Sequence, residues 1–147
     1  LEAYTSKGSI VTPTAVAADD IMFSYSHYGY DGSQYKLSNV ISASVDPDAT
    51  VSSGAVPGQL IIATTPDNGS TLKFVVLDKD GNFGINVTNP TKKLEVNGNG
   101  QFASEVLLGR MDQTAINALT AANGMIVYNT TTNKFQGYEN GAWSNLI

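Results

Sequence analysis

The sequence lacks cysteine altogether, has a single histidine, and only 14% of its 147 residues are charged. Without cysteine, neither a disulfide framework nor a thiolate metal site can form. No apolar run approaches the ~20 residues that a membrane-spanning helix requires, so we expect no membrane insertion. Because the chain starts with Leu1 rather than Met, we expect a processed chain or a part of a longer one.

Basic residues are also scarce. The formal net charge is -5, and the largest basic cluster is the pair Lys92–Lys93. Nucleic-acid-binding domains neutralise phosphates with clustered lysine and arginine side chains. We therefore expect no nucleic-acid partner.

Residues that favour strands and turns are abundant, and 14 of them are glycine. Alternating apolar and polar residues predict strands over 21–27 and 35–45, and apolar runs predict strands over 60–64 and 72–77. Between them, the stretch 46–57 is rich in Asp, Ser, Gly and Pro and is expected to be a long surface loop.

The stretch 77–98 is interpreted as a joint between two β modules. Asp80–Gly81 predicts a tight turn before a short strand over residues 83–87. Asn89–Pro90 ends that strand, because Pro90 has no N–H and restricts the residue before it. Alternation at residues 94–96 predicts another short strand ahead of a Gly-rich exit.

The C-terminal part is expected to combine strands with one short helix. Residues 101–108 are interpreted as a possible strand. A helix is predicted over residues 112–122, with Asp112 as its N-cap and Gly124 ending it. The last segments predict a three-stranded meander over 125–129, 134–138 and 142–146.

These segments divide the chain into two small modules. Residues 1–9 are expected to be a tether, 10–86 a sandwich-like N-terminal β module, 87–100 the joint, and 101–147 a C-terminal β-meander module with one short helix. The predicted fold class is all-β. A single core rarely suffices below roughly 70–80 residues unless staples support it, so association between chains is the remaining source of stability.

No catalytic or cofactor-binding constellation is predicted. His27 is the only histidine, and no Gly-x-Ser-x-Gly elbow accompanies it. Paired carboxylates for glycoside hydrolysis could be drawn from Asp19, Asp20, Asp46 or Asp48, but solvated loop residues are the preferred interpretation. We expect no enzyme activity and no cofactor.

A metal site is not expected either. The run from Asp78 to Asn82 resembles the start of a calcium loop, but Asn89 stands where the loop needs its bidentate glutamate. A plain β-turn is the preferred interpretation, because Asp and Asn stabilise turns through their own backbone.

Aromatic residues are the strongest candidates for ligand contacts. Tyr28, Tyr30, Asp31 and Tyr35 gather around one predicted turn, where ring faces and a carboxylate could stack on a sugar and accept its hydroxyl protons. These four residues are the predicted ligand-binding site. Large aromatics also fill cores, and that role is expected for Phe23, Phe135 and Trp143.

Several motifs resemble tail-fibre proteins of tailed bacteriophages. The pattern Asp-x-x-Gly-Asn-x-Gly-Ile, followed by x-Pro-(x)3-Leu-x-Val-x-Gly, lies between residues 78 and 98. Val56–Leu60 with Ala63–Pro66 resembles the strand that precedes this junction in the fibres. Residues 124–138 with 141–143 are similar to their distal β module. The resemblance extends from about Tyr28 onward, and Asn86 departs from it because the family usually has glycine there.

The resemblance implies a parallel homotrimer whose chains share their cores around a three-fold axis. It implies a virion tail-fibre segment, extracellular, that presents or spaces a host-receptor-binding surface. The implied partners are copies of itself, other tail or fibre proteins, and a host surface glycan or protein. A related pattern occurs in surface proteins of aquatic Bacteroidetes, so a bacterial cell-surface adhesion module is the first alternative. A glycan-cleaving tailspike is the second.

Overall fold

The computed structural model describes residues 5–8, 12–67, 69 and 71–146. The chain divides into two compact units, Leu1–Gly100 and Gln101–Ile147. Nearly all regular structure is β, with one short helix, which confirms the all-β prediction. Residues 1–4 and 9 of the predicted tether lie outside the described residues; Lys7–Gly8 (β1) pairs antiparallel with Pro13–Thr14 (β2).

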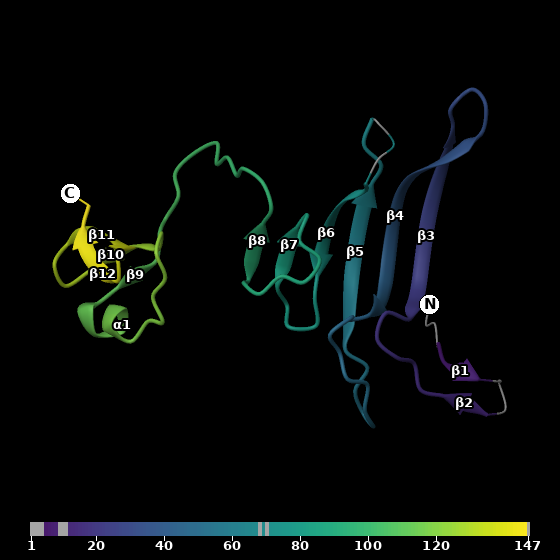
Figure 1. The fold of residues 1–147 in the computed structure, drawn as a ribbon, viewed down its shortest axis with the longest axis horizontal. Coiled ribbons are helices and arrows are strands. Elements are labelled where there is room, and N and C mark those ends of the chain that lie inside the picture. Colours follow the sequence, from purple (N-terminus) through teal and green to yellow (C-terminus); the bar gives the residue numbers. More distant parts are fainter. Residues whose placement is uncertain (1–4, 9–11, 68, 70, 147) are drawn as a thin grey trace. The chain divides into compact units, whose positions relative to one another are not determined.

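The first unit is dominated by one six-stranded sheet in which sequence neighbours are also spatial neighbours (Figure 1). Its strands, in this order, are β3 (Ile21–Tyr30), β4 (Tyr35–Val45), β5 (Gly58–Thr64), β6 (Lys73–Leu77), β7 (Phe83–Ile85) and β8 (Leu94–Val96). The pairs from β3 to β7 are antiparallel, and β8 joins β7 in parallel. The strands predicted on either side of the proposed joint therefore belong to the same sheet.

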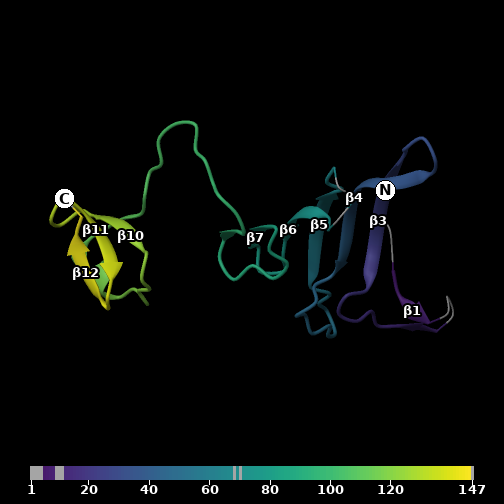
Figure 2. The same cartoon turned by 45° about the horizontal axis from the view of Figure 1, so that its top comes forward.

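The six strands form one sheet, whereas a sandwich-like arrangement was expected (Figure 2). A sandwich needs a second sheet whose inner face covers the first. Among the described residues of the first unit, the apolar side chains that become buried are few: Val16, Val45, Ala63, Val76 and Pro90. The domain boundaries predicted at residues 9, 86 and 100 stay predictions.

The bend after β7 is built without the glycine usual in the family. Asn86 adopts φ 54°, the left-handed conformation that asparagine tolerates better than most residues. Its backbone N–H donates to the carbonyl of Phe74 at 2.9 Å, and its side-chain oxygen accepts from the N–H of Phe74 at 3.2 Å. The side chain thus holds the bend against β6.

The second unit is a four-stranded sheet with one helix against its edge strand. Its order is β12 (Ala142–Asn145), β11 (Lys134–Glu139), β10 (Ile126–Asn129) and β9 (Arg110–Met111). The predicted meander is present, and its second turn contains Asn140 and Gly141, both with positive φ. The pairing of β9 in parallel with β10 was not predicted.

Two C-terminal predictions are wrong. Residues 101–108 form no strand, since none of their backbone groups pairs with a neighbouring strand, and regular structure resumes only at Arg110. Helix α1 spans Gln113–Asn117 rather than 112–122. Asp112 caps it as predicted, accepting from the N–H of Ala115 at 2.8 Å. Isolated helices need about 12–15 residues to be stable, and burial of Ile116 alone supports a single turn.

A buried amide network holds the second unit together. Asn129 is fully buried. Its side-chain nitrogen donates to the side-chain oxygens of Gln113 at 2.7 Å and Gln136 at 3.1 Å. Its side-chain oxygen accepts from the N–H groups of Thr131 and Thr132 at 2.9 and 3.2 Å. The network joins α1, β10 and β11 and satisfies every polar group of the Asn129 side chain.

Candidate functional site

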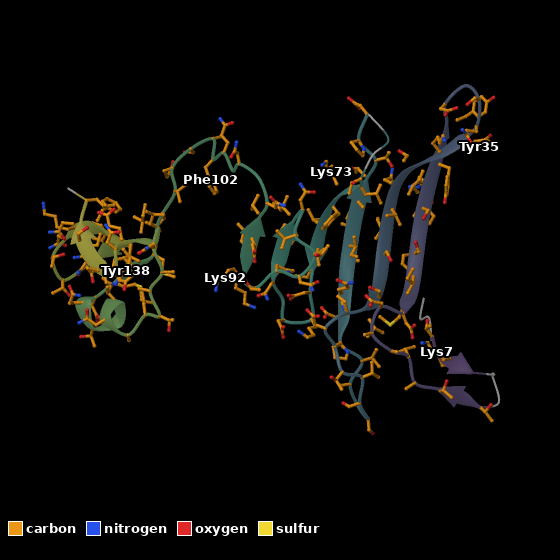
Figure 3. The ribbon with its side chains drawn as sticks, viewed as in Figure 1. Lys7, Tyr35, Lys73, Lys92, Phe102 and Tyr138 are labelled. Atoms are coloured by element: carbon orange, nitrogen blue, oxygen red, sulfur yellow. The ribbon has the colours of Figure 1, made fainter. Side chains whose placement is uncertain are left out.

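The hairpin formed by β3 and β4 reaches beyond the rest of its sheet. Strand β5 pairs with β4 only from Asn39 to Val45, whereas β3 pairs with β4 as far as Tyr30 and Tyr35. The end of the hairpin is therefore a two-stranded overhang, visible in Figure 1 beyond β5 and marked by Tyr35 in Figure 3. It carries all four residues of the predicted ligand-binding site.

A β-bulge on β4 and the alternation along β3 together set the direction of the tyrosines in this overhang. The register shifts between His27 and Tyr28, so that Ser38 on β4 has no partner on β3. Beyond the bulge, Tyr28 pairs with Leu37 and Tyr30 with Tyr35. Side chains alternate along a strand, so Tyr28 and Tyr30 project on the face opposite to Tyr25 and His27.

The tyrosine side chains of the overhang form an open aromatic surface. The rings of Tyr30 and Tyr35 lie 5.4 Å apart between centroids with an interplanar angle of 58°. Tyr28, Tyr30 and Tyr35 are 61%, 62% and 72% exposed. Aromatic rings with a polar tip that remain in water are suited to contact a partner with both polar and apolar parts.

Asp31 organises the turn that closes the hairpin. One oxygen of its carboxylate accepts from the N–H of Ser33, the hydroxyl of Ser33 and the N–H of Gln34, each at 2.8 Å. Gly32 supplies a φ of 100°, which an L side chain rarely adopts. The hydrogen bonds from Gln34 and Ser33 lower the pKa of Asp31 from 3.8 to about 2. The carboxylate therefore serves the turn first, and only its other oxygen is left for a ligand.

The order of this turn should depend on pH in a defined window. Because the folded pKa of Asp31 is depressed, its contribution to the turn is complete above the unfolded value of 3.8 and is lost as the pH falls through about 2. The amide resonances of Ser33 and Gln34, followed by NMR, should titrate with a midpoint near 2. The variant Asp31→Asn should remove this titration. A midpoint near 3.8 would show that the carboxylate is not held by the turn.

His27 lies on β3 between an amide and an aromatic ring. Its Nδ1 lies 2.7 Å from the side-chain oxygen of Asn39, and its ring contacts Tyr25 edge-on at 4.5 Å. Neither neighbour is a carboxylate or a second histidine. A non-catalytic role for His27 stays a prediction.

The acidic residues considered for glycoside hydrolysis have structural partners. Asp20 pairs with Lys7 at 2.9 Å and accepts from the N–H of Ala17 at 2.7 Å. Asp46 is buried and accepts from the N–H groups of Asp48 and Lys79. These carboxylates hold loops in place.

The calcium-like run from Asp78 to Asn82 forms a turn. The carboxylate of Asp78 accepts from the N–H groups of Asp80 and Asn82, and Gly81 has φ 70°. Within the part of the chain that the structure describes, no group of three or more acidic or histidine side chains could hold a metal ion. Over the same residues, no helix is long and apolar enough to cross a membrane.

One further hollow was not predicted. An open groove of about 550 Å³ lies over the sheet face that carries Ser42, Ile61 and Phe74, and its lining is mainly apolar. Its residues come from strands and loops far apart in the sequence, so no local motif indicates it.

Comparison with known proteins identifies the C-terminal part. Residues 84–147 match a family described as "Phage tail like trimerisation region". No curated protein matches the chain. The matched range contains β7 from Gly84 onward, β8 and the whole second unit, including the motifs at 124–138 and 141–143. The match confirms the resemblance to tail-fibre proteins of tailed bacteriophages, and it supports a phage tail structural protein that associates with copies of itself.

Proposed function

We propose that the chain is a non-enzymatic segment of a bacteriophage tail fibre that presents a host-receptor-binding surface on the overhang of the β3–β4 hairpin. The proposal goes beyond a phage tail structural protein in three respects. The chain forms a parallel homotrimer, it has an extracellular position on the virion, and it contacts a host surface glycan or protein. The other proposed partners are neighbouring tail or fibre proteins.

The observation that carries the proposal is the aromatic overhang. Three tyrosine rings are more than half exposed, two of them in contact, at the end of a hairpin that no other strand of the sheet covers. Binding residues concentrate on segments that a rigid scaffold displays. A trimer would present three such surfaces, so that weak contacts add through avidity.

Two alternatives compete with this proposal. A bacterial cell-surface adhesion module would use the same overhang on a cell instead of a virion. A glycan-cleaving tailspike would bind a polysaccharide and also release products from it. The structural partners of Asp20 and Asp46 and the pairing of His27 with the amide of Asn39 favour binding without cleavage.

The test is the double substitution of Tyr28 and Tyr30 with alanine. Loss of two stacking rings, each contributing roughly 1 kcal/mol, should weaken adsorption of the purified protein to host cells by about tenfold or more. The matched control replaces both residues with phenylalanine, which keeps the rings and should retain most adsorption. Light scattering must show the same assembly for all variants.

Two results would contradict the proposal. Undiminished adsorption of the alanine variant would move the receptor site elsewhere and leave the segment as a spacer. Release of oligosaccharides from host polysaccharide by the unmodified protein would show that the protein is a glycan-cleaving tailspike.

A further inference from the structure

Two apolar rows cross the entire six-stranded sheet on one face. The first row follows the register partners Phe23, Ala43, Leu60, Leu77, Phe83 and Leu94. The second row follows Tyr25, Ile41, Ile62, Val75, Ile85 and Val96. Members of the two rows stand two residues apart on every strand, so they share a face. We call these two rows the apolar face.

The apolar face is largely uncovered in the single chain. Phe23 is 52% exposed, Ile62 is 45% exposed and Leu94 is 58% exposed, which places solvent-accessible carbon at both ends and in the middle of the face. Phe23 was expected to fill a core, and within one chain it does not. A sheet needs at least one apolar face packed against another layer. Among the described residues of the first unit, the buried side chains Ala63 and Val76 lie on the opposite face of the sheet, and the apolar face has no such layer over it.

The chemistry of the face limits what can cover it. Neither row contains a charged residue. The next position along the strands is a polar row of His27, Asn39, Thr64 and Lys73, which bounds the face on one side. An apolar centre with a polar border is the pattern of a buried protein interface.

The face is also continuous with the matched region. Ile85, Leu94 and Val96 lie within residues 84–147, the range that matches the trimerisation region, and they complete rows that begin on β3. The apolar face therefore runs without interruption from the matched range at β8 across β7, β6, β5 and β4 to β3.

We propose that the apolar face packs against the same face of other copies of this chain, so that self-association extends from the matched region to residues 23–77. The inference rests on the proposed function, because it needs the trimer. It assigns the missing second layer of the sheet to the neighbouring copies. It also places the tyrosines of the overhang on the opposite face of the hairpin, away from the contact between copies.

Single cysteines test this proposal in the full chain, because the protein has none of its own. Three variants place one thiol each on the apolar face: Ile41→Cys, Leu60→Cys and Ile62→Cys. Two controls, Ser24→Cys and Ser42→Cys, place it on the opposite face of the same sheet. Any disulfide in such a variant must join two copies, so covering of the face by the chain's own second unit produces no cross-link.

The expected result is a covalent dimer from at least one thiol of the apolar face after mild oxidation. Disulfides need Cβ atoms roughly 3.5–4.5 Å apart, so the yield should exceed that of the controls by about tenfold. Light scattering of each unoxidised variant gives the assembly. A trimer without cross-links from the apolar face would overturn this inference and leave the trimer standing. A folded monomer would overturn both.

Discussion

Replacement of Gly84 with valine is expected to lower the free energy of unfolding by about 3 kcal/mol, because the core cannot accept a larger residue there. Gly84 is buried in β7 between β6 and β8. A Cβ atom at this position would meet the carbonyl oxygen of Val87 at 2.5 Å and the Cβ of Val87 at 3.2 Å. The first obstacle is backbone, which cannot rotate away as a side chain can.

The matched control is Gly29→Val. Gly29 also lies in a strand, and a Cβ atom there would meet nothing within 4 Å. Valine suits an open strand position, so this variant should stay within about 0.5 kcal/mol of the parent. Denaturant unfolding at one fixed protein concentration measures both variants, since association shifts apparent stability. Equal stability of the two variants would show that the bend at Val87 adapts.

Replacement of Asn129 with leucine should destabilise the second unit by about 3 kcal/mol, since it leaves several buried groups without partners. The variant removes both donors that reach Gln113 and Gln136 and the acceptor of two backbone N–H groups. The side chain of Asn129 is fully buried, so water cannot replace these bonds without opening the unit.

Trp143, the single tryptophan of the chain, reports on this unit. It lies on β12 with its ring 5.2 Å from the ring of Tyr138, so its fluorescence follows the unfolding of the meander. The control is Asn117→Ala. It removes the exposed side-chain oxygen that accepts a hydrogen bond from the side-chain nitrogen of Gln113 at 2.8 Å, and it should lower the free energy of unfolding by roughly 0.5 kcal/mol. An unchanged free energy of unfolding for the Asn129 variant would mean that the amide network makes no net contribution to the stability of the second unit.

The features that could be predicted from the sequence are those that depend on residues close together in the chain. The predicted strand over 35–45 coincides with β4, and Asp112 caps the helix as expected. Strand alternation and capping act between residues close in the chain. The predicted site residues also lie together, because Tyr28, Tyr30, Asp31 and Tyr35 belong to one hairpin.

Features that depend on register or on distant partners were not predicted. The extra residue at Ser38 puts Tyr35 on the same face as its partner Tyr30, and no composition signal marks a bulge. The contact of Asn129 with Gln113 joins residues 16 positions apart. A two-residue parallel strand such as β9 carries no periodicity at all. The apolar face emerges only when the five registers of the six-stranded sheet are combined.

The order of the strands has a consequence for how the chain is made. Each of the four inner strands of the six-stranded sheet is hydrogen-bonded to the strands that precede and follow it in the sequence. Contacts between close segments form quickly, and domains begin to fold while synthesis continues. The strands therefore emerge from the ribosome in the same order in which they lie in the sheet, and each can pair with the strand made just before it. No strand has to be threaded between two that are already paired.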